Sequence, residues 1–135
     1  MKIPDEIQNI IKEKKLNHFD DFLNKKDKYI LDKNKNVIPA SVMEWGTYLE
    51  ECMEERIVKK DTINDLRVST VFIGLDHKFS SEEERKKPDY KPDIFETMVF
   101  KDREDIYCDR YATWKEAEEG HQKAIEWIKN GCQDE

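Results

Sequence analysis

Two histidines and one glutamate have the types and positions that could support chemistry. His77 follows a strongly apolar segment, Glu96 lies inside the next apolar segment, and His121 lies on the apolar face of a predicted helix. Two imidazoles and a carboxylate can bind zinc or iron, or can act as general acid and base. These residues are catalytic candidates only if the fold brings them together. Otherwise Asp76 and His77 form a turn, and His121 is a hydrogen-bonded core residue.

The spacing of the other reactive residue types matches no metal or cofactor motif. The histidines do not form an H-x-x-x-H or H-E-x-x-H pattern. Cys52, Cys108 and Cys132 are far apart, so the sequence supports neither a disulfide framework nor a zinc site. The four glycines are also too dispersed to form a phosphate-binding loop. We therefore predict no metal and no cofactor, and an enzyme is the less favoured class.

The charge of the chain favours a binding function. The sequence has 31 acidic and 24 basic side chains, which gives a net charge of -7. An acidic chain repels phosphate backbones, so we do not expect direct binding to nucleic acid. Clustered carboxylates could instead face a basic protein surface, although solvated charge that aids solubility is the alternative. The residues that we assign to binding are Glu82, Glu83, Glu84, Glu118 and Glu119.

The elements that must position these residues are predicted from hydrophobic periodicity and turn signals. Capping boxes at Ser41 and Thr113, each with glutamate three residues later, predict the starts of two helices. The expected helices cover residues 41–54 and 113–130. The expected strands cover residues 29–32, 37–39, 56–63, 66–75, 94–100 and 106–112. The pattern predicts an α+β fold, in which both helices pack on an antiparallel sheet of four to six strands.

Burial follows from the same pattern. Residues 66–75 carry β-branched side chains on both faces, which indicates a central strand. Gly120 interrupts the last helix, where a glycine would let the helix lie close to the sheet. We expect a common core made of Trp45, Phe72, Val99, Trp114 and Ile125.

The domain organisation is predicted to be simple. Residues 1–28 read as an N-terminal helical appendage with an apolar stripe, and residues 29–135 as a single α+β domain. Residues 80–92 are charged and read as a surface loop. No apolar run reaches the length of a membrane span, and the N-terminus does not read as a signal peptide. We therefore expect a cytoplasmic protein that has no contact with a membrane.

Several segments resemble a family of small uncharacterised proteins from bacteriophage and prophage genomes. The most specific segment is R-V-S-T-V-F-I-G-L-D-H, at residues 67–77. The resemblance also covers residues 29–32, 43–45, 95–100 and 110–121. Together with the residues between them, these segments span about three quarters of the chain. It implies a mobile-element setting and brings no established catalytic residues. The sequence departs from the family at the appendage and at residues 80–92, where a specialised binding function could lie.

Three hypotheses for function remain open. The first is a phage-type accessory protein that inhibits a host defence component, as an anti-CRISPR protein does. Its partner would be a host protein with a basic surface, such as a nucleic-acid-binding effector. The second is an enzyme that uses His77, Glu96 and His121. The third is a sponge that holds a nucleotide signal in an aromatic and basic pocket, formed by Arg67, Arg110 and Tyr111.

Overall fold

The computed structural model of the chain describes residues 27–78 and 80–133. The predicted appendage, apart from residues 27 and 28, lies outside the described residues. The described residues form an α+β fold, as the sequence predicted, but their strands make two antiparallel sheets where one was expected. They divide into two compact units. The first unit contains residues 27–56 and Gly74–Asp76, and the second contains Ile57–Ile73 and the residues from His77 onward.

The first unit is a hairpin with one helix. Strands β1 (Lys28–Leu31) and β2 (Val37–Ala40) pair antiparallel, and helix α3 (Val42–Glu51) packs against both. The hairpin turn is stabilised by the Asp32 carboxylate, which accepts hydrogen bonds from the backbone N–H groups of Asn34 and Asn36. These bonds, the one from Asn36 foremost, lower the pKa of Asp32.

Helix α3 begins with the predicted capping box. The Ser41 hydroxyl accepts a hydrogen bond from the N–H of Glu44, and the Glu44 carboxylate accepts one from the N–H of Ser41. Both bonds satisfy backbone donors that a helix start leaves without partners.

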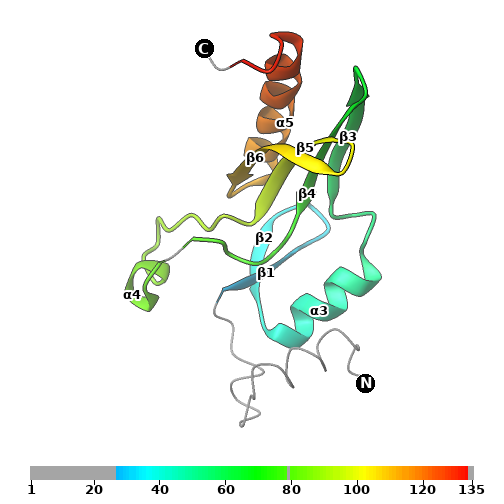
Figure 1. Cartoon of the computed structure of the whole chain (residues 1–135). Helices are drawn as coiled ribbons and strands as arrows, with labels where there is room; N and C mark the ends of the chain where they lie inside the picture. Colours follow the sequence, from blue (N-terminus) through cyan, green and yellow to red (C-terminus); the bar gives the residue numbers. More distant parts are fainter. Residues whose placement is uncertain (1–26, 79, 134–135) are drawn as a thin grey trace. The chain divides into compact units, whose positions relative to one another are not determined.

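The second unit is a four-stranded antiparallel meander covered on one face by a helix (Figure 1). Its strands lie in the order β3 (Ile57–Ile63), β4 (Leu66–Phe72), β5 (Phe95–Lys101) and β6 (Glu104–Tyr111). Helix α5 (Trp114–Lys129) packs across all four strands. The predicted position of β4 inside the sheet is therefore confirmed, and β6 lies at one edge.

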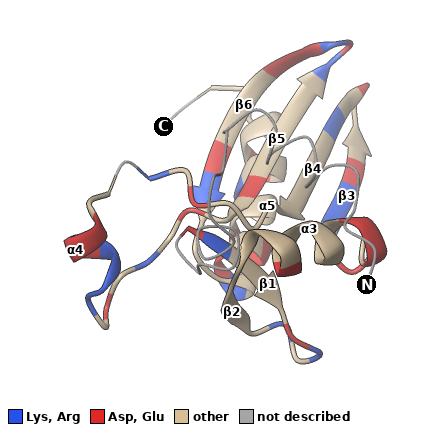
Figure 2. Ribbon diagram, turned by 90° about the horizontal axis from the view of Figure 1, so that it is seen from below, with Lys and Arg blue, Asp and Glu red and all other residues tan. Residues whose placement is uncertain are grey.

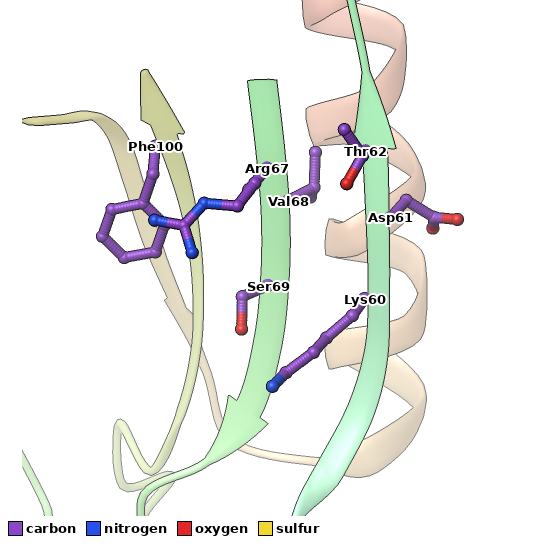
Figure 3. Close-up of a pocket in the computed structure, with 7 residues that line it drawn as sticks. All are labelled: Lys60, Asp61, Thr62, Arg67, Val68, Ser69 and Phe100. Carbon is purple, nitrogen blue, oxygen red and sulfur yellow. The ribbon is translucent and has the colours of Figure 1, made fainter. Parts of the chain in front are cut away.

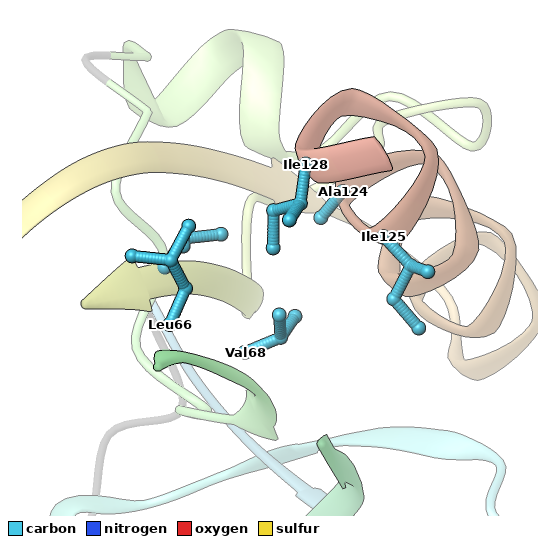
Figure 4. Close-up of a cluster of buried hydrophobic side chains, with 6 residues drawn as sticks. Leu66, Val68, Ala124, Ile125 and Ile128 are labelled. Carbon is cyan, nitrogen blue, oxygen red and sulfur yellow. The ribbon is translucent and has the colours of Figure 1, made fainter. Parts of the chain in front are cut away.

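The core of this unit lies between α5 and the sheet (Figure 4). Buried and more exposed residues alternate along β4 and β5, as expected for a sheet with one covered face. The central apolar cluster consists of Leu66, Val68, Val99, Ala124, Ile125 and Ile128. Beside it, Phe72 and Phe95 make an edge-to-face contact with 5.0 Å between ring centroids.

Three details differ from the sequence predictions. The two main helices do not share a sheet, because α3 packs on the hairpin and α5 on the meander. Trp45 and Trp114 are only half-buried, whereas Phe72, Val99 and Ile125 are buried as expected. At the start of α5, the Thr113 hydroxyl accepts from the N–H of Glu116 as predicted. The Glu116 carboxylate, however, accepts from that hydroxyl, which leaves a half-formed capping box.

Residues 80–92 form the predicted surface excursion between β4 and β5. They contain one short helix, α4 (Glu82–Arg85), capped by the Ser81 hydroxyl. In both views of the fold this segment projects away from the sheet (Figures 1 and 2).

Candidate functional site

The three catalytic candidates do not converge. His77 is exposed where the chain enters the 80–92 loop. Glu96 lies on the face of the sheet opposite α5, where its carboxylate accepts a hydrogen bond from Arg110 at 3.0 Å. His121 lies on α5 and is buried beneath the other face. Successive residues of a strand point to opposite faces of the sheet, and Glu96 points away from the face that α5 covers. The sheet therefore separates Glu96 from His121.

His121 instead belongs to a buried polar network. Its Nε2 atom lies 2.7 Å from the Asp61 carboxylate on β3, and its Nδ1 atom lies 2.7 Å from the Thr70 hydroxyl on β4. The Thr70 hydroxyl is also 2.6 Å from the Thr97 hydroxyl on β5. Thr70 and Thr97 are fully buried, whereas a third of the Asp61 side chain is exposed. The network thus ties α5 to three of the four strands.

A single order of donors satisfies this network when the imidazole is neutral. His121 then donates from Nε2 to the Asp61 carboxylate, and its Nδ1 accepts from the Thr70 hydroxyl. Thr97 in turn donates to the Thr70 oxygen. Carboxylate, imidazole and hydroxyl in sequence are the parts of a nucleophilic triad. Here the hydroxyl is sealed in the core, so the arrangement holds the helix on the sheet and offers no reactive atom to a substrate.

Tyr111 completes the covered face of the sheet at the end of β6. Its ring lies against Gly120 of α5, and a Cβ at position 120 would stand 2.0 Å from Tyr111 Cζ. The expected role of Gly120 in a close helix–sheet contact is therefore confirmed. The buried Tyr111 hydroxyl has no hydrogen-bond partner of good geometry among the described residues. Burial raises the pKa of this phenol.

The carboxylates assigned to binding are exposed, but they lie in separate places. Glu82, Glu83 and Glu84 make up most of α4 on the projecting loop, which Figure 2 colours red for acidic residues. Glu118 and Glu119 lie on the outer face of α5. Figure 1 shows α4 and α5 well apart within the unit. The two groups therefore provide two acidic surfaces and not one array.

The loop that carries α4 is braced around Tyr90. The Arg85 guanidinium donates to the backbone carbonyls of Ser80 and Lys78, at 3.3 and 3.0 Å. The cations of Arg85 and Lys78 lie 5.9 and 5.6 Å from the centroid of the Tyr90 ring. Lys78 also donates to the carbonyl of Lys91. These contacts fix the conformation of the loop that carries the glutamates of α4.

The sheet face opposite α5 carries a pocket of about 410 Å³. Its lining includes Lys60 and Thr62 from β3, Arg67 and Ser69 from β4, and Phe100 from β5 (Figure 3). The Arg67 guanidinium lies over the Phe100 ring, 5.3 Å from its centroid. Cations, hydroxyl groups and an aromatic surface therefore meet on one patch of the sheet.

The pocket predicted to hold a nucleotide signal, formed by Arg67, Arg110 and Tyr111, is not present as predicted. Arg67 and Arg110 share a face of the sheet, but Arg67 pairs in register with Phe100, whereas Arg110 pairs with Glu96, four residues along β5. Arg110 is also engaged by the Glu96 carboxylate. Tyr111 lies on the covered face. Of the three predicted residues, only Arg67 lines the pocket.

The buried network has a signal in the sequence that hydrophobic periodicity alone overlooks. Thr70 lies between Val68 and Phe72 in the alternation of β4, and Thr97 lies between Phe95 and Val99 in β5. A polar residue at an inward position needs a buried partner, since an unsatisfied polar group in a core is costly. For the pocket, no signal identified Lys60, Ser69 and Phe100 as neighbours, because their proximity depends on strand register.

Comparisons with protein-family models, curated proteins and solved structures found no match for this chain. Within residues 27–78 and 80–133, no three His, Cys, Asp or Glu side chains form a group that could hold a metal ion. None of the helices described for this chain combines the length and the apolar character that crossing a bilayer requires.

Proposed function

We propose that this chain is a phage-type accessory protein that inhibits a host defence component in the host cytoplasm, as an anti-CRISPR protein does. It binds a host protein with a basic surface, of the kind found on nucleic-acid-binding effectors. The observation that carries the proposal is the braced α4 segment, which presents the exposed residues Glu82, Glu83 and Glu84. The net charge of -7 and the resemblance of residues 67–77 to phage proteins support it.

The physical basis is electrostatic complementarity. The three exposed carboxylates of α4 form a negative patch beside the cations Arg85, Lys86 and Lys87, and this patch can attract a positively charged surface and orient the encounter. The contacts of Arg85 and Lys78 around Tyr90 order the loop before binding, which reduces the conformational entropy lost on association. A partner that binds DNA or RNA has such a surface, so the protein would compete with nucleic acid for it.

The enzyme hypothesis receives less support. Its best residue, His121, has a side chain that is only 1% exposed, and hydrogen bonds engage both of its ring nitrogens. A general acid or base must come within hydrogen-bond reach of a substrate, which this position does not allow without opening the core.

Affinity capture from lysate of a host bacterium tests the proposal. The baits are the wild-type protein, a variant with Glu82, Glu83 and Glu84 all changed to Lys, and a control with Glu50, Glu51 and Glu54 changed to Lys. Both variants change the net charge equally, and all six positions are exposed. We expect a basic-surfaced host protein to be captured by the wild type and the control but not by the α4 variant. Equal capture by all three baits would contradict the α4 interface.

A further inference from the structure

We propose that the pocket on the face of the meander opposite α5 binds a nucleoside phosphate. The pocket brings Lys60, Arg67 and Phe100 together from three neighbouring strands (Figure 3). This site is separate from the carboxylates of α4, and the inference does not depend on the protein partner proposed above.

The strand register explains why these side chains gather. Lys60 pairs with Ser69, and Thr62 pairs with Arg67, so all four side chains share one face of β3 and β4. Arg67 also pairs with Phe100 on β5, which places the aromatic ring beside the guanidinium. Asp61, whose carboxylate accepts from His121, points away from this face (Figure 3). Among the described lining residues, the only carboxylate is therefore directed elsewhere.

The charge of the pocket is unusual for this chain. Acidic side chains outnumber basic ones, yet neither Lys60 nor Arg67 forms an ion pair with any described residue. Asp105, the register neighbour of Phe100 on β6, does not pair with Arg67 either. Two cations with hydroxyl groups between them can contact phosphate oxygens through charge-assisted hydrogen bonds.

The aromatic component indicates what is attached to the phosphate. A planar base can stack on the Phe100 ring or on the Arg67 guanidinium, as bases do on aromatic and arginine planes in RNA-binding proteins. The volume of about 410 Å³ lies within the usual range for small-ligand pockets. The net charge of -7 opposes a long polyanion, whose distant phosphates would meet the acidic surface. These features together favour a small nucleotide over a nucleic acid.

Titration calorimetry with ADP in the absence of divalent cations tests the site. We expect saturable binding with a Kd below about 1 mM. Lys60→Ala and Arg67→Ala should each weaken it about tenfold, the usual effect of losing a charge-assisted hydrogen bond. Lys59→Ala is the matched control, because Lys59 is the adjacent lysine, lies 4.0 Å from the Asp61 carboxylate and does not line the pocket. This control should leave ADP binding unchanged.

Two further probes separate the parts of the ligand. Pyrophosphate lacks the base, and adenosine lacks the charge, so both should bind more weakly than ADP. Phe100→Leu should reduce the preference for ADP over pyrophosphate, with an unchanged circular dichroism spectrum showing that the fold is intact.

The proposal is wrong if ADP shows no saturable binding, or if Lys59→Ala weakens binding as much as Lys60→Ala. Tighter binding of a short single-stranded oligonucleotide than of ADP would also overturn it and assign the face to nucleic acid. The α4 variant with three lysines should bind ADP normally, so failure of this site and failure of the proposed function are distinguishable.

Discussion

The ring of Tyr111 lies so close to Gly120 that a Cβ at position 120 would stand 2.0 Å from Tyr111 Cζ. This contact sets how near α5 comes to the edge of the sheet. Overpacking a core contact costs about 1–3 kcal/mol, whereas alanine gains about 1 kcal/mol over glycine in a helix. Gly120→Ala should therefore destabilise the protein in urea unfolding. In a Tyr111→Val background the same change should become neutral or stabilising, and destabilisation of equal size in both backgrounds would contradict the contact.

The Thr70 hydroxyl, at the centre of the buried network, should contribute more to the free energy of unfolding than the Thr97 hydroxyl at its end. Thr70→Val removes a partner of both His121 and Thr97, at a cost of about 1–3 kcal/mol for the polar groups left unsatisfied. Thr97→Val removes the hydrogen bond to Thr70 but leaves the one between Thr70 and His121, so its cost should be smaller. The control Thr62→Val, at an exposed position on the opposite face, should change stability by less than about 0.5 kcal/mol. Equal costs for Thr70→Val and Thr97→Val would argue against the network.

Much of the fold was predictable because its signals are local. The capping box of Ser41 and Glu44 marks the start of α3. In residues 66–72, buried and more exposed side chains alternate, as expected for a strand with one buried face. The site was not predictable in the same way. Asp61, Thr70 and His121 meet only through strand register and helix placement, which no local pattern specifies. Glu96 cannot join them, because it lies on the face of β5 opposite to the buried Thr97.

The aromatic core should depend strongly on Phe72. This side chain is fully buried and contacts Phe95 edge to face. Phe72→Ala should cost about 3–5 kcal/mol in urea unfolding, as large truncations in cores do. A cost below about 1 kcal/mol would contradict the placement of Phe72 in the core.

Alkaline pH should weaken the protein partly through Tyr48. Burial, the largest cause, raises the pKa of its phenol to about 12. Between pH values of about 10 and 12 the unfolded chain therefore loses this proton while the folded chain retains it, so stability falls as pH rises. Tyr48→Phe should show a shallower fall in the free energy of unfolding across this range. Identical slopes for the variant and the wild type would refute the assignment.

Cys108 should be a slow nucleophile although it is exposed. Partial desolvation of the sulfur and the neighbouring Glu96 raise the pKa of its thiol, whereas Arg110 lowers it. The rate of its reaction with a disulfide reagent at pH 8 should rise in Glu96→Gln and fall in Arg110→Gln. Both changes should stay below about tenfold, which corresponds to one pKa unit. The measurement uses a background in which Cys52 and Cys132 are changed to Ser. Rates that move in the same direction in both variants would contradict the opposite effects of Glu96 and Arg110 on the thiol.

The most direct test of the proposed function is the association rate with the captured host partner as a function of ionic strength. If the α4 carboxylates guide binding, the rate should fall steeply as salt screens their field. Changing Glu82, Glu83 and Glu84 to Gln should slow association more than it speeds dissociation, and should flatten the salt dependence. An association rate that ignores both salt and these substitutions, with binding lost only when residues 1–27 are deleted, would contradict the acidic interface.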